Sequence, residues 1–301
     1  MTAANGRDEG AQLLLLHDPV FRLGILPVHP FGLCAAIGIV AGYALALWSA
    51  LRAGLPARYL PGMLVVVVLG AFIVARIGFV LAYPALTGDD AQGILAFWRG
   101  GLSLPAGVFG GAVLLAVYTW ARRESLWRWA DVLSPAVALG LAIGMLGLPG
   151  GGEGWGQPTN GLLSMSVPAD ALPASLLARA THTHDRFQPI WAYEAALFAA
   201  LTIVLLLIAI AARRRYVAGA PVGEPPSGTI GLVFLFVTML GYGLLRPLTL
   251  DASDPALVLR TQLFCAAVAA IACGLLVTRL VTTRADLAVT REIERVKAPF
   301  S

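Results

Sequence analysis

The chain has 301 residues, of which 58% are hydrophobic and 13% are charged. Soluble domains carry about 25% charged residues, so this composition excludes an ordinary soluble protein and indicates an integral membrane protein. The formal net charge of +4 does not point to nucleic acid, because the basic residues are scattered over short segments beside apolar runs. We therefore expect no nucleic-acid partner.

Seven apolar runs are long enough to cross a hydrocarbon core about 30 Å thick, which takes roughly 20 helical residues. The runs are 31–51, 60–83, 105–121, 131–148, 190–212, 229–248 and 258–280. None of the segments between them is long enough to form a soluble core. The sequence therefore predicts an all-α integral membrane protein in which residues 1–301 form a single seven-span domain.

Most arginine and lysine residues follow the odd-numbered spans, at 52–58, 122–128, 213–215 and 279–297. Short loops retained in the cytoplasm carry an excess of positive charge. We therefore expect the N-terminus to lie outside and the C-terminus, with a tail at 281–301, to lie in the cytoplasm.

Two longer segments are expected on the outer side. Residues 84–104 are too short and interrupted to cross, and Trp98 and Arg99 suit the headgroup layer, so this segment is predicted to be an interfacial arm. Residues 149–189 are rich in Gly, Pro, Ser and Ala and form either a small lid or a partly disordered cap. The cytoplasmic segments are shorter, so chemistry is expected to face outward.

Charged side chains inside spans cost about 2.5 to 3.5 kcal/mol on insertion scales and are functional candidates by default. Arg76, near the outer end of the second span, is either an anchor reaching for headgroups or a buried partner for phosphate or carboxylate. Arg246 lies one helical turn after Tyr242, and the two form either an anion site or an interfacial anchor pair. Pro247 is expected to disfavour helical geometry at Arg246 and to open the helix there.

A glycine-rich segment, GMLGLPGGGEGWG at 144–156, closes the fourth span and contains Glu153. Glycines allow close backbone approach, and exposed amides can form an anion-binding concavity. Glu153 either orients an arginine or accepts a proton there, or the segment is a plain turn. Glu194, early in the fifth span, is either an interface residue or a pairing carboxylate.

Metal and cofactor chemistry lacks support in the sequence. Cys34, Cys265 and Cys273 all fall within spans and are interpreted as small buried apolar residues. The HTHD stretch at 182–185 is typical of an exposed polar loop. The motifs of nucleotide-driven transport, zinc proteolysis and serine hydrolysis are absent, so we expect no metal and no cofactor.

Several short motifs occur in a fixed order along nearly the whole chain. They are WRGGLS at 98–103, the glycine-rich segment at 144–156, QPIWAYEA at 188–195 and YGLLR at 242–246. In order, spacing and placement at the outer face, they resemble the bacterial prolipoprotein diacylglyceryl transferases.

The resemblance implies a reaction and a place for it. Family members move the diacylglyceryl group of phosphatidylglycerol onto the cysteine thiol of a prolipoprotein signal sequence and release glycerol phosphate. They are multi-pass proteins of the bacterial cytoplasmic membrane and act on its outer side. Such a reaction requires a phosphate clamp, help in deprotonating a thiol and a cavity open to lipid. Phosphatidylglycerol, or a related anionic phospholipid, and the prolipoprotein signal sequence are thus the implied partners.

The family's functional positions carry over where the motifs match. Arg246 and Tyr242 fall on its essential Arg and Tyr, Glu153 and Gly156 on the acid and glycine of its signature, and Arg76 on the Arg of its GRxGY stretch. The resemblance therefore implies Arg246, Glu153 and Tyr242 as catalytic. The implied substrate-binding residues are Arg76, Gly156, Gly100, Gly101, Ser103, Arg99 and Glu194.

Six family positions carry a different residue here. They are Phe31, Pro105, Met145, Leu148, Gln188 and Leu250, in place of a tyrosine, a histidine, an arginine, an asparagine, a histidine and an acid. Asp251 and Arg99 are candidates to compensate for the missing acid and arginine. The alternative to an active transferase is a catalytically degenerate homologue that binds anionic lipid or a signal sequence, and a transporter or channel is the third reading.

Overall fold

The computed structural model describes residues 21–23, 26–28, 30–83, 101–149, 154–161, 163–166, 186–217, 226–249 and 255–297. Within them, seven helices are long and apolar enough to cross a membrane, which confirms the predicted spans of a multi-pass membrane protein. The helices are α2 (Pro30–Arg52), the second span Ala57–Ala82 that ends in α4 (Gly70–Ala82), α7 (Leu104–Ala121), α8 (Leu126–Met145), α10 (Ile190–Val217), α11 (Thr229–Leu245) and α12 (Pro255–Lys297). Which end faces the cytoplasm stays a prediction.

The second span is a composite of four pieces. A 3-10 turn (η1, Ala57–Tyr59), a short helix (α3, Leu60–Met63) and a π-helical turn (η2, Leu64–Leu69) lead into α4. The π-helical turn has the sequence LVVVVL, and branched Cβ atoms crowd the preceding turn of a helix.

Two boundaries differ from the predictions. The fourth span begins at Leu126 rather than at 131, because the polar residues Arg128 and Asp131 hide the first turns of α8 from a hydropathy pattern. The seventh helix continues to Lys297, so the tail expected at 281–301 is helical as far as that residue and forms the last part of α12.

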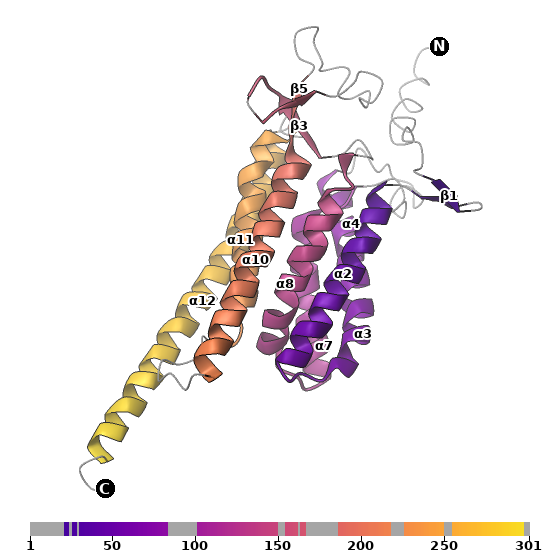
Figure 1. The fold of residues 1–301 in the computed structure, drawn as a ribbon. Helices are drawn as coiled ribbons and strands as arrows, with labels where there is room; N and C mark the ends of the chain where they lie inside the picture. The colour runs from indigo at the N-terminus through magenta and orange to yellow at the C-terminus, as the bar shows by residue number, and fades with distance from the viewer. Residues whose placement is uncertain are drawn as a thin grey trace, which may run out of the picture.

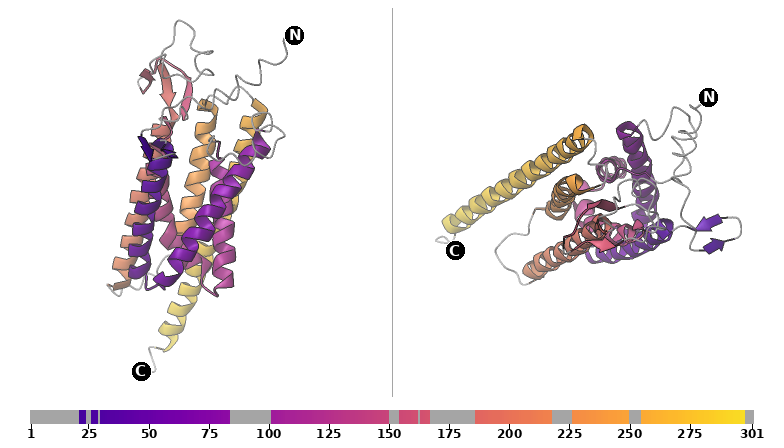
Figure 2. Two further views of the ribbon diagram at one scale, coloured as in Figure 1. Left: turned by 90° about the vertical axis from the view of Figure 1, so that its right-hand side faces the viewer. Right: turned by 90° about the horizontal axis from the view of Figure 1, so that it is seen from above.

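The helices lie roughly side by side with α8 at the centre of the packing (Figures 1 and 2). Helices α2 and α10 pack mainly on α8, and α4 packs mainly on α7. Helix α11 lies between α8 and α12, and α12 packs almost entirely on α11. We call the upper end in Figure 1, where α4 ends and α7, α10 and α12 begin, the site end. The opposite end, where α2 and α7 end and α8 begins, is called the arginine-rich end.

Small residues bring α2 and α8 into backbone contact. The buried face of α2 consists of Gly38, Gly42, Ala46 and Ala50, spaced by one turn each. A Cβ atom added to Gly38 would lie 2.6 Å from the carbonyl oxygen of Gly140. Because lipid tails are as apolar as the helices, spans associate through such close packing rather than through a hydrophobic driving force.

Replacing Gly38 with Ala should therefore destabilise the protein by about 1 to 3 kcal/mol, since the backbone of Gly140 cannot give way as a side chain would. Thermal unfolding in detergent measures this. Gly32→Ala is the matched control on the same helix, because a Cβ there meets nothing within 4 Å. Equal melting temperatures for the two variants would show that α2 and α8 are not held by this contact.

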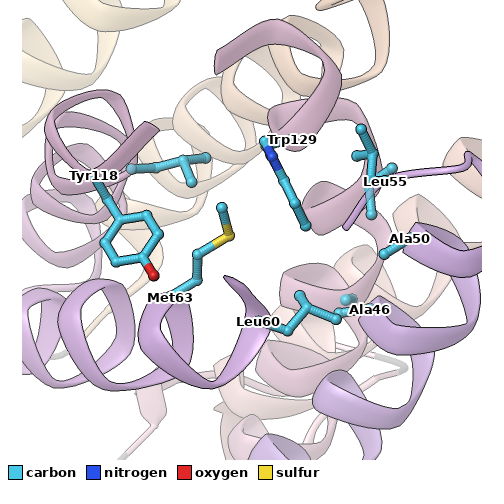
Figure 3. Close-up of a cluster of buried hydrophobic side chains, with 10 residues drawn as sticks. Ala46, Ala50, Leu55, Leu60, Met63, Tyr118 and Trp129 are labelled. Atoms are coloured by element: carbon cyan, nitrogen blue, oxygen red, sulfur yellow. The ribbon is translucent and has the colours of Figure 1, made fainter. Parts of the chain in front are cut away.

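A buried apolar cluster fills the arginine-rich end between α2, α3, α7 and α8 (Figure 3). Trp129 is fully buried at its centre, with Leu60 and Met63 beside it. The hydroxyl of Tyr118 donates to the carbonyl oxygen of Tyr59 at 3.3 Å, which ties α7 to the start of the second span.

Asp131 explains how a carboxylate is accommodated in the fourth span. Its oxygens accept hydrogen bonds from the backbone amides of Gly228 at 2.6 Å and Gly231 at 2.9 Å. These amides belong to the first turn of α11, where a helix has unsatisfied N–H groups and a positive dipole end. Asp131 therefore caps a helix that lies far away in the sequence.

Two small sheets were not foreseen by the prediction of an all-α chain, although the protein is mostly helical. Strands β1 (Phe21–Leu23) and β2 (Leu26–Val28) form an antiparallel pair. At the site end, β3 (Trp155–Pro158), β5 (Arg186–Pro189) and β4 (Met165–Ser166) form a sheet in the order β3-β5-β4. The described part of the predicted cap is thus a sheet whose last strand leads directly into α10 (Figure 1).

Candidate functional site at the site end

Arg246 lies where α11 changes into a 3-10 turn, η6 (Arg246–Leu248). The helix ends at Leu245, as Pro247 suggested, but Arg246 itself keeps right-handed helical angles of φ −56° and ψ −41°. The expectation that Pro247 would disfavour helical geometry at Arg246 was therefore wrong. The amide of Arg246 still donates to the carbonyl of Tyr242, and its own carbonyl accepts from the amide and hydroxyl of Thr249.

The side chain of Arg246 is 8% exposed and lies among polar groups from three other helices. Its guanidinium donates a hydrogen bond to the hydroxyl of Tyr83, at the end of α4. Glu194 on α10, which is also 8% exposed, lies within electrostatic range of Arg246, as do Tyr242 and Cys265. A buried cation and a buried carboxylate so arranged favour each other, because the interior screens charge less than water does.

Arg76 is buried in α4, with 5% of its surface exposed, so it does not reach toward headgroups as an interfacial anchor would. Its guanidinium donates to the carbonyl oxygen of Gly101 at 3.0 Å and lies 5.6 Å from the ring centroid of Phe79. The ring of Phe79 stacks on that of Tyr83 with centroids 4.8 Å apart. One face of α4 therefore connects Arg76 to the hydroxyl that contacts Arg246.

The described end of the predicted arm is fastened to α4. Gly101 has φ +78°, and a Cβ there would lie 2.5 Å from the ring of Phe79, so both the backbone angle and the space require glycine. The amide of Ser103 donates to the carbonyl of Ala75 at 3.0 Å, and Ser103 is the N-cap of α7. Gly101 and Ser103 thus position the arm through their backbones, whereas Arg99 and Gly100 lie outside the described residues.

Gly156 lies buried between the sheet and the turn that carries Arg246. It pairs with Thr249 in an isolated antiparallel bridge. A Cβ on Gly156 would lie 2.5 Å from the carbonyl oxygen of Leu248 and 2.9 Å from both the Cβ of Gln188 and the Cγ1 of Ile190. The glycine of the signature is therefore needed for a close approach of three chain segments directly beside η6.

Two further hydrogen bonds hold the sheet to the helices beneath it. The amide of Trp191 donates to the carbonyl of Gly154 at 2.9 Å, and the side-chain amide of Gln157 donates to the carbonyl of Pro247 at 3.2 Å. Glu153, which immediately precedes Gly154 in the chain, lies outside the described residues, so its predicted role remains a prediction.

The positions that depart from the family pattern lie around the same end. A Cβ on Gly147 would lie 2.7 Å from the Cα of Phe31, so the segment after α8 packs on the start of α2. Met145 packs against the apolar cluster between α8, α10 and α11. The buried carbonyl oxygen of the Gln188 side chain has no hydrogen-bond partner within the described ranges. Leu250 lies outside them.

The sequence analysis missed two residues of this group. Tyr83 follows Arg76 by two helical turns and therefore lies on the same face of α4, a spacing that was available as a signal. Cys265 is 1% exposed on α12 and packs beside Gly243, 3.3 Å from the position that a Cβ there would occupy. Nothing in the sequence distinguishes it from the other cysteines.

The described residues contain no group of three or more His, Cys, Asp or Glu side chains that could hold a metal ion. The expectation of no metal stays an expectation for the whole chain. What the described site offers is the buried guanidinium groups of Arg246 and Arg76, hydroxyl donors and a carboxylate, a set suited to binding an anion.

Replacing Tyr83 with Phe should lower the activity of the site about tenfold and also lower the stability, because hydrogen bonds to charged groups contribute about 1.5 to 3 kcal/mol and Arg246 is buried. Tyr118→Phe removes the same hydroxyl at the arginine-rich end and is the matched control. The transfer rate measured with each purified variant compares them. Equal rates for Tyr83→Phe and the wild type would mean that this hydroxyl does not position Arg246 for function.

The amino-acid sequence of this chain is similar to those of one known family. The family described as prolipoprotein diacylglyceryl transferase matches residues 19–280. A phosphatidylglycerol–prolipoprotein diacylglyceryl transferase of Nostoc is 28% identical over 220 residues, which cover 73% of this chain and 74% of that protein. A protein of the same name from Xanthomonas euvesicatoria is 35% identical over 212 residues, 64% of this chain and 71% of its own length. The one from Bordetella parapertussis is 34% identical over 163 residues, 52% and 62% respectively. Because the match spans most of the chain and all seven helices, this membrane protein belongs to the prolipoprotein diacylglyceryl transferase family.

Proposed function

We propose that this chain transfers the diacylglyceryl group of phosphatidylglycerol to the cysteine thiol of a prolipoprotein, at the outer face of a bacterial cytoplasmic membrane. The observation that carries the proposal is the burial of Arg246 at one end of the bundle, in contact with Tyr83 and within electrostatic range of Tyr242 and Glu194. Its relatives carry this activity in their names.

The reaction assigns a task to each group. The thiol sulfur forms a bond to the glyceryl carbon, the bond from that carbon to the phosphate oxygen breaks, and glycerol phosphate leaves with the electron pair. Arg246 stabilises the charge that grows on the leaving phosphate, with Tyr242 donating a hydrogen bond to it. The thiol proton goes to a base, for which Glu153 is the candidate.

The remaining residues act by position. Glu194 balances the charge of Arg246 within the bundle when no phosphate is bound. Arg76 holds the described end of the arm through the carbonyl of Gly101, so that residues 101–103 lie at the site end. Gly156 keeps the sheet close to η6.

A transfer assay with the purified protein tests the proposal. The protein is reconstituted with phosphatidylglycerol and a peptide containing a signal sequence with its cysteine, and mass spectrometry follows the gain of one diacylglyceryl group. The same peptide with Cys replaced by Ser, and vesicles of phosphatidylcholine alone, are the negative controls. Transfer to the cysteine peptide only, together with release of glycerol phosphate, is the expected result.

The replacement of two signature residues by Met145 and Leu148 supports one competing function, a homologue that binds lipid without turnover. That protein would retain phosphatidylglycerol in native mass spectrometry but would modify no peptide. It would also fail to restore lipoprotein maturation in cells depleted of their own transferase, so this outcome would replace the proposed function.

A further inference from the structure

Two arginines at the arginine-rich end converge on one tyrosine ring. Arg58, in η1, lies with its Cζ 5.0 Å from the ring centroid of Tyr59 and donates to its hydroxyl at 3.2 Å. Arg122, which follows α7, lies 6.0 Å from the same centroid and 5.4 Å from that of Tyr118. The two guanidinium groups therefore both lie near a single ring, where their like charges repel each other.

No carboxylate in the described part of the chain pairs with Arg58 or Arg122, whose polar contacts are the tyrosines named above. Other arginines at this end are differently engaged. Arg128 donates to the carbonyl of Ala53 at 3.1 Å, and Arg213 to that of Arg52, where the carbonyl groups at the end of α2 attract positive charge. Arg58 and Arg122 cap no helix end in this way and are both exposed.

Arg123 adds a third positive charge at some cost in backbone strain. It has φ +57° in the turn after α7, where the amide of Glu124 bonds the carbonyl of Thr119 and the amide of Arg123 bonds that of Trp120. This is a Schellman turn, whose left-handed position is usually glycine because other residues lose about 1 to 2 kcal/mol there.

The end of α2 shows the same turn with the usual residue. Gly54 has φ +66°, and Leu55 and Gly54 bond the carbonyls of Ala50 and Leu51 in the same pattern. The two turns lie at the same end of the bundle, so the arginine in the strained position of one of them adds charge at a place where the backbone favours glycine.

An open hollow of about 590 Å³ adjoins this turn and is lined by Trp120, Ala121, Arg123 and Glu124. Trp120 is 81% exposed, and tryptophan side chains favour the headgroup region of a bilayer. The hollow thus combines the apolar surface of Trp120 with the charge of Arg123. Arg122 belongs to the same turn, and Arg58 lies with it near Tyr59.

We propose that Arg58, Arg122 and Arg123 bind the phosphate of an anionic phospholipid in the leaflet at the arginine-rich end, with Trp120 against its glycerol and acyl chains. Guanidinium groups bind phosphate through paired charged hydrogen bonds, and an anion between Arg58 and Arg122 removes their mutual repulsion. This lipid would be a bound, non-reacting one, held at the opposite end of the bundle from Arg246 and independent of the transfer reaction.

The test uses Trp120 as a local probe of the lipid beside it. The full-length protein is reconstituted in phosphatidylcholine vesicles that contain a minor fraction of phosphatidylglycerol with brominated chains, which quench tryptophan fluorescence on contact. The difference in quenching between the wild type and Trp120→Phe reports the lipid at Trp120 alone. The reference is the same fraction of brominated phosphatidylcholine.

We expect brominated phosphatidylglycerol to be enriched at Trp120 about a hundredfold relative to phosphatidylcholine, because about 1 kcal/mol for each of the three arginines adds to about 3 kcal/mol and every 1.4 kcal/mol is a factor of ten. Enrichment should persist at 1 M salt, where the screening length falls to about 3 Å and only direct contacts remain. Loss of all enrichment at 1 M salt would show diffuse attraction in place of a bound lipid and overturn the proposal.

Two double variants that remove equal charge distinguish a specific lipid site from the effect of net charge. Arg58→Gln with Arg122→Gln should abolish the enrichment at 1 M salt, whereas Arg128→Gln with Arg213→Gln removes the same charge from the same end and should keep it. Equal loss in both pairs would contradict the proposal. Glu124→Gln, which removes the acid from the hollow without touching the arginines, should raise the enrichment, and a decrease would also contradict it. Arg246→Ala should leave the Trp120 signal unchanged, so failure here and failure of the transfer reaction are separate results.

Discussion

Replacing Arg246 with Ala should reduce diacylglyceryl transfer by about a hundredfold or more while the protein still folds. The side chain is a buried cation at the site end, and removing one preorganised group that stabilises developing negative charge costs about 2.7 to 4 kcal/mol in other enzymes. Single-turnover rates with the purified variant, together with the mass shift of the signal peptide, measure the loss.

Two further variants show whether the lower transfer rate of Arg246→Ala comes from loss of a phosphate contact or only from loss of a positive charge. Arg246→Lys keeps the charge but not the planar fork of donors, so it should recover only a small part of the rate if the phosphate is bound through paired hydrogen bonds. Arg260→Ala removes an exposed arginine near the start of α12, at the same end, and should leave the rate close to that of the wild type. If Arg246→Ala retained the rate and Arg260→Ala lost it, the phosphate clamp would have to be assigned elsewhere.

Replacing Gly156 with Ala should produce the second large effect, a loss of transfer of about ten- to a hundredfold. The added methyl group would lie 2.5 Å from the carbonyl oxygen of Leu248, which belongs to the same turn as Arg246. Because that neighbour is backbone, the sheet and η6 must move apart, and a displacement of about 1 Å at a reacting group can cost a hundredfold in rate.

Gly161→Ala is the control for this effect. It lies in the same described part of the cap, but its Cβ would meet only the hydroxyl of Thr159 at 3.5 Å, an ordinary contact. We expect it to match the wild type in rate and in melting temperature. A Gly156→Ala protein with normal activity would show that the sheet tolerates movement and does not position Arg246.

Both predictions concern a site that the sequence identified only in part. Arg246, Tyr242 and Glu194 were found because a charged residue or its partner inside an apolar run is costly and therefore conspicuous. Tyr83 was missed because its side chain carries no charge and because 163 positions separate it from Arg246, whose guanidinium donates to its hydroxyl. A hydrogen bond between α4 and η6 leaves no periodic trace in the sequence.

For the glycines at 144–156, too, the sequence identified the residues but not their neighbours in the structure. The number of glycines at 144–156 predicted a close backbone approach, yet the neighbour that makes Gly156 intolerant of a side chain is Leu248, at the end of the sixth span. The same holds for Gly38, whose partner Gly140 lies three spans later. Pattern reasoning finds the residue that must be small, and only the packed bundle reveals what it must accommodate.

The sequence by itself determined the seven spans, since hydrocarbon demands a minimum length of apolar helix wherever the chain crosses. It also indicated the asymmetry of charge between the two ends, because that is a count of arginines along the chain. Only the tertiary structure decided that Asp131 caps α11, that Arg76 holds the arm through Gly101, and that the cap contains a sheet. The physical reason is that membrane insertion is governed by local hydropathy, whereas these contacts depend on which helices pack together and at what distance.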